Sequence, residues 1–207
     1  MNFLIIEANH DSATKAVHIA RRTALRNLSN GNGNAIIELF GYNATESNVD
    51  QSWHEIFGNF RLITGMGHGS ASEFTGHNDL PIFTTTKSKN VYKDAIVHLF
   101  SCNCGNSLGF SIKANGAKAF IGYTDFVGIA SIDALNEHFV AEAAAIDIAI
   151  YQGQPSGVVK SRADTAYAQA RANLEASPNA TPSDLATLES NHAALVGPWN
   201  NGSLGSF

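Results

Sequence analysis

Two apolar segments of the chain end in residues that can do chemistry. The segment from Ala95 to Phe100 has the length of a buried strand, and Cys102 follows it in a small, polar and glycine-containing stretch. The segment that begins at Phe60 has the same pattern, an apolar run followed by glycines, and His68 lies between two of those glycines. A cysteine attacks as its thiolate, which a neighbouring imidazole stabilises. The pattern therefore predicts a His68 and Cys102 pair at the carboxyl ends of two strands.

The elements that must position this pair alternate between strands and helices. We expect strands at Phe3 to Ile6, Ala35 to Tyr42, Arg61 to Thr64, Ala95 to Phe100 and Gly116 to Tyr123, and helices at Ser12 to Asn30, Asn48 to Phe57, Ser107 to Asn115, Ile132 to Ile150 and Ser156 to Glu175. A short helix capped by Ser183 and an edge strand at Ala193 to Val196 would follow. This alternation predicts an α/β fold with a mostly parallel central sheet and helices on both faces.

Three further expectations concern the first helix, the polar segment after His68 and the number of domains. Alanines recur every fourth residue in the helix that begins at Ser12, so Arg21 and Arg22 are expected away from its apolar side. The polar segment from Ser70 to Lys89 is expected to form a loop or short hairpin beside the His68 and Cys102 pair. No repeat or linker divides the sequence, so we expect one domain over residues 1–207, with a flexible tail from about residue 197.

The composition narrows the classes of protein to consider. The chain has 207 residues, 44% of them hydrophobic and 15% charged, and its net charge of −5 argues against a surface for nucleic acid or for an anionic membrane. The first apolar run is too short for a signal peptide or a transmembrane helix. Two cysteines separated by a single residue build no disulfide framework. We therefore expect a cytoplasmic protein without nucleic-acid or membrane partners.

Several motifs together resemble one known family. Gly67-His-Gly-Ser70 resembles the His-Gly motif of the caspase-like cysteine peptidases of clan CD. Leu99-Phe-Ser-Cys-Asn-Cys-Gly105 is similar to the Leu-Ser-Ala-Cys-Glu-Thr-Gly element of its CHAT branch, whose domains are grouped with separases and gingipains. Gly116-Ala-Lys-Ala-Phe-Ile-Gly122 resembles the strand that follows, and Tyr151-Gln-Gly153 with its Ala-rich helix resembles the helix pair of that branch. The likeness covers roughly residues 60 to 175.

The resemblance implies a caspase-like three-layer sandwich and a thiol protease that hydrolyses a peptide or protein substrate without a cofactor. Carried over by position, it implies Cys102 as the nucleophile and His68 as the base. The family is usually described as a dyad, so we assign no third member. Acyl transfer also needs donors for the developing oxyanion, for which the N–H groups of Gly69 and Cys102 are the natural pair.

The substrate is a separate expectation. Asp125, after the fifth strand, and Asp11, after the first, lie on the same edge of the sheet as the predicted pair. Either carboxylate could bind an arginine guanidinium through two hydrogen bonds. Relatives that cut after arginine or lysine carry such an acidic residue, so we expect cleavage after a basic residue. The metacaspase pattern places an aspartate two residues before the cysteine, where this chain has Phe100.

Three alternatives stay open. Cys104 would take the place of the nucleophile if the register of the strand slipped by two residues. Cys102, Cys104, His68 and His77 have the side chains of a zinc site, although their spacing matches no structural zinc motif. The chain could also be a latent or inactive caspase-fold module that needs a regulatory partner, self-association or processing for activity.

Overall fold

A computed structural model describes residues 2–25, 35–55, 60–87, 90–200 and 205 of the chain. The strands are β1 (Asn2–Glu7), β2 (Ile36–Phe40), β3 (Phe60–Met66), β4 (Glu73–Thr75), β5 (Pro81–Thr84), β6 (Ile96–Phe100), β7 (Ala119–Tyr123) and β8 (Leu195–Val196). The α-helices are α1 (Ser12–Leu25), α2 (Glu46–Glu55), α3 (Ser107–Ala114), α4 (Asn136–Tyr151), α5 (Ser156–Ala176) and α6 (Pro182–Ala194). The expected α/β class is confirmed, while residues 26–30, 56 and 57 of the expected helices lie outside the described residues.

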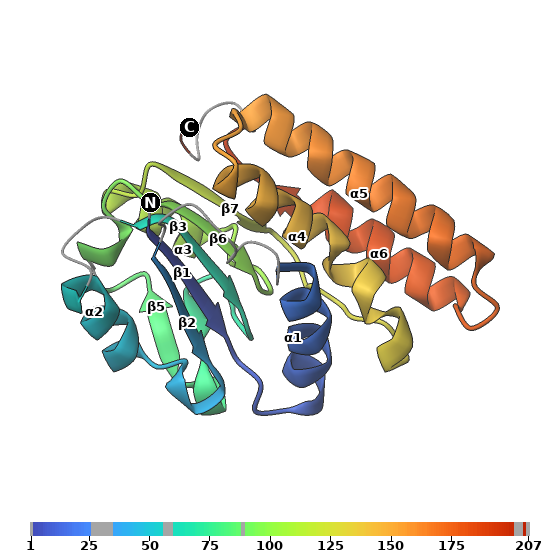
Figure 1. The fold of residues 1–207 in the computed structure, drawn as a ribbon, viewed down its shortest axis with the longest axis horizontal. Helices are drawn as coiled ribbons and strands as arrows, with labels where there is room; N and C mark the ends of the chain where they lie inside the picture. Colours follow the sequence, from blue (N-terminus) through green and yellow to red (C-terminus); the bar gives the residue numbers. More distant parts are fainter. Residues whose placement is uncertain (1, 26–34, 56–59, 88–89, 201–204, 206–207) are drawn as a thin grey trace.

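Six strands form the central sheet in the order β2-β1-β3-β6-β7-β8 (Figure 1). The first five run parallel, and β8 pairs antiparallel with β7. The predicted C-terminal edge strand is therefore present, but Ala193 and Ala194 belong to α6. Because β2 and β3 lie on opposite sides of β1, the chain reverses its direction across the sheet between β1 and β3. Open α/β sheets bind ligands beyond the carboxyl ends of strands at such a reversal.

Both faces of the sheet are covered by helices. Successive strand residues point to opposite faces, so Leu62 packs beneath α1, α4 and α5, while Ile63 packs beneath α2, α3 and the β4–β5 pair. Figure 1 shows α1 and α2 on opposite sides of the sheet, with α4, α5 and α6 on the same side as α1. The helices over the described ranges are each too short or too polar to cross a membrane.

Arg21 departs from its expected place on the polar side of its helix. Its side chain is completely buried, because α4 packs on α1 and covers a second face of that helix. Its guanidinium donates to Glu7 of β1 at 2.9 Å and to Asp147 of α4 at 2.7 Å, and it also contacts Thr64 of β3. Burial alone would lower the pKa of Arg21, but attraction by the two carboxylates raises it.

This buried network also accounts for His98. The residue lies inside β6, and its Nδ1 is 2.8 Å from Asp147 Oδ1, so His98 is a hydrogen-bonded histidine of the core. Burial would raise the pKa of Asp147, but Arg21 and His98 together hold that pKa below its usual value. The network therefore joins three strands of the sheet to helices from both halves of the chain.

The segment between β3 and β6 forms the predicted hairpin, in which β4 and β5 pair antiparallel. Phe74 and Phe83 are fully buried, so the hairpin forms part of one core. The prediction that Ser183 caps α6 is wrong, because Pro182 is already inside the helix and Thr181 is the cap. Thr181 and Asp184 exchange the two hydrogen bonds of a capping box.

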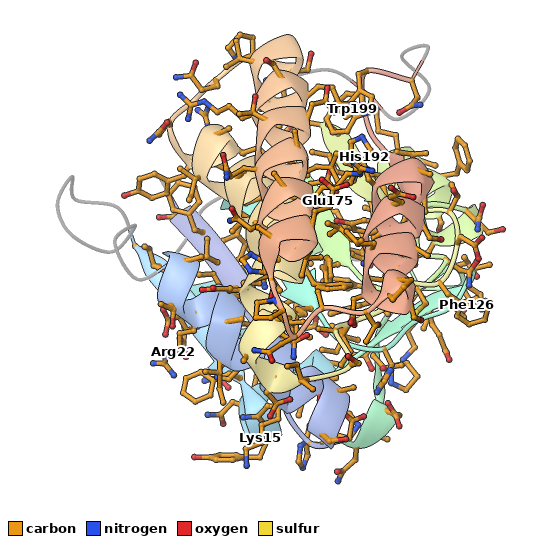
Figure 2. All side chains as sticks on the ribbon, turned by 90° about the vertical axis from the view of Figure 1, so that its right-hand side faces the viewer. Lys15, Arg22, Phe126, Glu175, His192 and Trp199 are labelled. Carbon is orange, nitrogen blue, oxygen red and sulfur yellow. The ribbon has the colours of Figure 1, made fainter. Side chains whose placement is uncertain are left out.

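Helices α4, α5 and α6 form a helical layer on the same side of the sheet as α1, and contacts among the three helices hold it together. His192 of α6 stacks on the ring of Tyr167 of α5 with 3.8 Å between centroids, and its Nδ1 is 2.6 Å from Glu142 of α4. Figure 2 shows His192 at the level where α5 and α6 lie side by side. The hydrogen bond with Glu142 raises the pKa of His192. This layer supports α4, which carries Asp147 of the buried network.

Candidate active site

Asp11 and His68 meet at the reversal between β1 and β3. Asp11 follows β1 and immediately precedes α1, where its Oδ1 accepts a hydrogen bond from the Thr14 N–H at 2.8 Å. Its second oxygen, Oδ2, lies 2.5 Å from Nε2 of His68, which follows β3. Aspartate is a preferred N-cap residue because its carboxylate satisfies a free N–H of the first helical turn. The cap of α1 therefore also holds the imidazole of His68.

The charge on Asp11 is stabilised by these contacts. Burial by itself would raise its pKa, but hydrogen bonds from His68 and Thr14 outweigh burial and lower the pKa to about 2. Asp11 is therefore a carboxylate at neutral pH and accepts a hydrogen bond from His68 Nε2. A neutral imidazole that donates from Nε2 keeps its lone pair on Nδ1, where it can act as a base.

Gly69 places the loop of His68 directly against the loop of Cys102. A Cβ atom at residue 69 would collide with Ser101 Oγ and would lie 3.3 Å from the Cys102 carbonyl oxygen, so the approach requires glycine. Among the described residues, neither the Gly69 N–H nor the Cys102 N–H donates a backbone hydrogen bond. These are the two groups predicted as oxyanion donors, and no backbone carbonyl of the described residues occupies either of them.

Cys102 and His68 line the same small pocket, whose volume is about 60 Å³. Most of its remaining wall is apolar, formed by Ala13, Thr14, Val17, Met66, Gly67, Phe100, Ser101, Val127 and Ile129. Cys102 Sγ accepts a hydrogen bond from the Val127 N–H at 3.3 Å. No hydrogen bond joins Cys102 to His68 in the described part of the chain, and such bonds are often long in unliganded enzymes.

Cys104 lies in a different environment from Cys102. Its side chain is fully buried, and its thiol donates toward the Ser101 carbonyl at 3.1 Å and the Leu99 carbonyl at 3.3 Å. Burial raises the pKa of Cys104 to about 12. Since the thiolate is the attacking species, Cys104 is an inert core thiol and Cys102 is the accessible one.

Asp125 lies beside Cys102, outside the shared pocket. Its carbonyl accepts a hydrogen bond from the Asn103 N–H at 2.9 Å, which joins the end of β7 to the residue after Cys102. Asn103 has a φ of 57°, which asparagine tolerates better than most residues. The Asp125 carboxylate is exposed, with Oδ1 accepting from the Phe126 N–H at 2.7 Å.

Two groups of described side chains come close enough together to hold a metal ion: His10 with His68 and Asp79, and Glu142 with Asp164 and His192. Neither group includes a cysteine, so the zinc site considered from sequence, with Cys102 and Cys104, is not assembled. In the second group Lys160 pairs with Asp164, and His192 is already engaged by Glu142. That group is a set of ion pairs within the helical layer.

The comparisons with known proteins leave the family open. A scan against protein-family models found no match, and a search of curated proteins found none either. The caspase-like resemblance therefore remains a hypothesis, which depends on the geometry around Cys102. Within that geometry, sequence reasoning missed Asp11 as the partner of His68 and Val127 as the donor to Cys102. An aspartate three residues before Thr14 was the available signal for the helix cap, but no sequence pattern joins it to His68.

Proposed function

We propose that the protein is a cysteine endopeptidase in which Cys102 is the nucleophile and His68 is the base. The observation that carries this proposal is the 2.5 Å contact between Asp11 Oδ2 and His68 Nε2. It leaves Nδ1 of His68 as the basic nitrogen in a site whose pocket also exposes Cys102. A nucleophile, a base and a group that orients the base are the usual components of covalent acyl transfer.

The reaction would proceed through an acyl-enzyme. His68 takes the thiol proton of Cys102, and Sγ forms a bond to the carbonyl carbon of the peptide. The negative charge that develops on the carbonyl oxygen is stabilised by the N–H groups of Gly69 and Cys102. His68 then donates the proton to the leaving amine as the C–N bond breaks. Water, deprotonated by His68, attacks the thioester, and the carboxylic acid product leaves with the thiol restored.

Asp125 is the better candidate for binding a basic side chain of the substrate. Asp11 is occupied by His68 and Thr14, whereas the Asp125 carboxylate is exposed beside the loop of Cys102. An arginine placed there could form two hydrogen bonds to the carboxylate. The peptide would then extend across Cys102 with its basic residue before the scissile bond.

Labelling with peptidyl electrophiles tests both parts of this proposal. We expect an electrophile that carries arginine before its warhead to modify Cys102, as located by mass spectrometry. Cys104→Ala should retain the label and Cys102→Ala should lose it. Asp125→Asn should lower the labelling rate with the arginine reagent about tenfold and leave the rate with an alanine reagent unchanged.

Each failure in this experiment has its own meaning. Modification of Cys104 instead of Cys102 would show that the site is assigned two residues too early. If Asp125→Asn is labelled by the arginine reagent at the wild-type rate, Asp125 does not bind the basic side chain of the substrate. If arginine, aspartate and alanine reagents all leave both cysteines unmodified, the proposal fails and the latent module becomes the better account.

Asp11→Ser separates the two roles of Asp11. Serine caps a helix about as well as aspartate, so the free energy of unfolding in urea should fall by only about 1 kcal/mol, the share of the half-exposed contact with His68. One hydroxyl cannot bond the Thr14 N–H and reach His68 together, so peptide hydrolysis should slow by about 10 to 100-fold. Ser12→Ala, an exposed neighbour, is the control. Unchanged hydrolysis by Asp11→Ser would show that Asp11 serves only the helix.

A further inference from the structure

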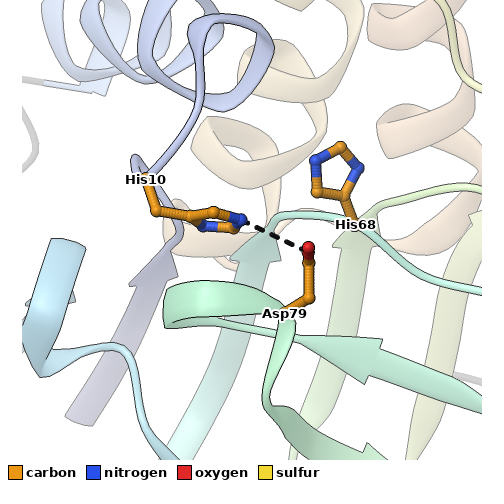
Figure 3. A group of neighbouring side chains, drawn as sticks. All are labelled: His10, His68 and Asp79. Carbon is orange, nitrogen blue, oxygen red and sulfur yellow. Dashed lines mark ion pairs between the residues drawn. The ribbon is translucent and has the colours of Figure 1, made fainter.

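The carboxylate of Asp79 points toward two imidazoles at the same edge of the sheet. Figure 3 shows His10, from the loop after β1, beside His68, from the loop after β3, with Asp79 reaching toward both. One ligand atom from each residue lies within 4.8 Å of the other two. The Nε2 atom of His10 is 3.3 Å from Oδ1 of Asp79. Tetrahedral bonds of about 2.05 Å to a metal would place neighbouring ligand atoms about 3.3 Å apart.

His10 lacks the partners that a buried imidazole usually has. Its side chain is 12% exposed, and both ring nitrogens are buried without a hydrogen bond among the described residues. The approach to Asp79 has the distance of an ion pair but not the alignment of a hydrogen bond. Buried polar groups are normally satisfied by protein, water or a ligand. In the neutral imidazole one of the two nitrogens carries a lone pair, which is therefore available to a metal ion.

The charges around His10 favour a cation. Asp11 Oδ2 lies 3.8 Å from His10 Nε2, and the exposed Asp79 adds a second carboxylate. The ring of His77 is 6.1 Å from that of His10, measured between centroids, so a third imidazole borders the group. Neutral imidazoles with a carboxylate are the ligand set of zinc sites that keep one position for water.

We propose that His10, His68 and Asp79 bind a divalent transition metal ion of the Zn²⁺ class, and that the bound ion switches off Cys102. The second half of this inference rests on the proposed peptidase function, whereas the metal site does not. A neutral imidazole that gives one nitrogen to a metal carries its proton on the other. His68 then cannot accept the thiol proton of Cys102, and acylation stops until the metal leaves.

Calorimetric titration with Zn²⁺ tests the site without using activity. Protein stripped with EDTA should bind one equivalent at pH 7.5. His10→Ala and Asp79→Asn should each weaken binding at least tenfold, and Cys102→Ala should bind as wild type does. No binding by the wild type would overturn the inference. Binding lost with Cys102→Ala but retained in His10→Ala would overturn it too, because the ion would then lie between Cys102 and His68.

Labelling of Cys102 tests the switch separately. One equivalent of Zn²⁺ should slow labelling by the arginine electrophile at least tenfold in the wild type, and EDTA should restore the rate. His10→Ala should label at the wild-type rate in EDTA and keep that rate when Zn²⁺ is added. A metal that binds as predicted but leaves wild-type labelling unchanged, or accelerates it, would refute the switch. If Cys102 is unlabelled even in EDTA, the peptidase proposal fails while the calorimetry still decides the metal site.

Discussion

Replacing His68 with alanine is expected to slow peptide hydrolysis by about 10² to 10⁴-fold, the contribution that a positioned acid and base makes. The variant keeps Cys102 and both oxyanion donors, so it loses only proton transfer and the stabilised thiolate. A small electrophile such as iodoacetamide needs the thiolate but no proton donor. Its reaction at pH 7 should therefore slow by much less than hydrolysis does.

The pH dependence of the reaction with iodoacetamide shows why His68→Ala reacts more slowly than the wild type. A thiol without an imidazole partner ionises only near pH 8.5, so the deficit of His68→Ala toward iodoacetamide should narrow as the pH is raised to 9. His54→Ala, which removes an exposed histidine near the end of α2, is the matched control and should react as wild type does. A deficit that stays constant with pH would assign His68 a purely structural role.

Replacing Arg21 with methionine is expected to destabilise the protein by about 3–5 kcal/mol, the usual cost of removing one partner from a buried ion pair. Methionine fills a similar length but leaves Glu7 and Asp147 facing each other without the guanidinium between them. Because the free energy of unfolding of native domains is only about 5–15 kcal/mol, this change would remove a large fraction of it. Unfolding in urea, followed by circular dichroism, measures the change.

The neighbouring arginine provides the matched control. Arg22 lies at the outer surface in Figure 2, with its guanidinium carbon 4.7 Å from the centre of the Phe40 ring and a 3.7 Å ion pair with Glu38. Arg22→Met should cost less than about 1 kcal/mol. Should Arg21→Met fail to fold, Arg21→Lys keeps the charge but cannot bridge both carboxylates, and an intermediate loss is expected. Equal losses for Arg21 and Arg22 would contradict the importance of the buried network.

The sheet was predictable because its strands are short apolar runs bounded by polar residues. Ile96–Phe100 is buried at every position, which is why a continuous apolar run, interrupted only by His98, marked it as a central strand. The burial of Arg21 could not be predicted in the same way. Periodicity within α1 describes one apolar face, whereas the second face is covered by α4, more than a hundred residues later in the chain.

The candidate site was predictable in part for a related reason. His68 and Cys102 follow strands, and the rule that parallel strands end at one edge brings their loops together without further information. Asp11 was expected at the same edge as a group that binds substrate, and its bond to His68 depends on where α1 begins. The distinct environments of Cys102 and Cys104, two residues apart, follow from the turn after β6, which the sequence does not specify.

The bond between Arg21 and Asp147 has a consequence for synthesis of the chain. Its two residues are 126 positions apart, so at about 5–20 residues per second a ribosome would add Asp147 roughly 6 to 25 s after Arg21. During that interval Glu7 is present but Asp147 is not, so water must take the place of Asp147 at the guanidinium. The face of the sheet beneath α1 and α4 can therefore close only after α4 emerges, which makes the first half of the protein dependent on the second for its core.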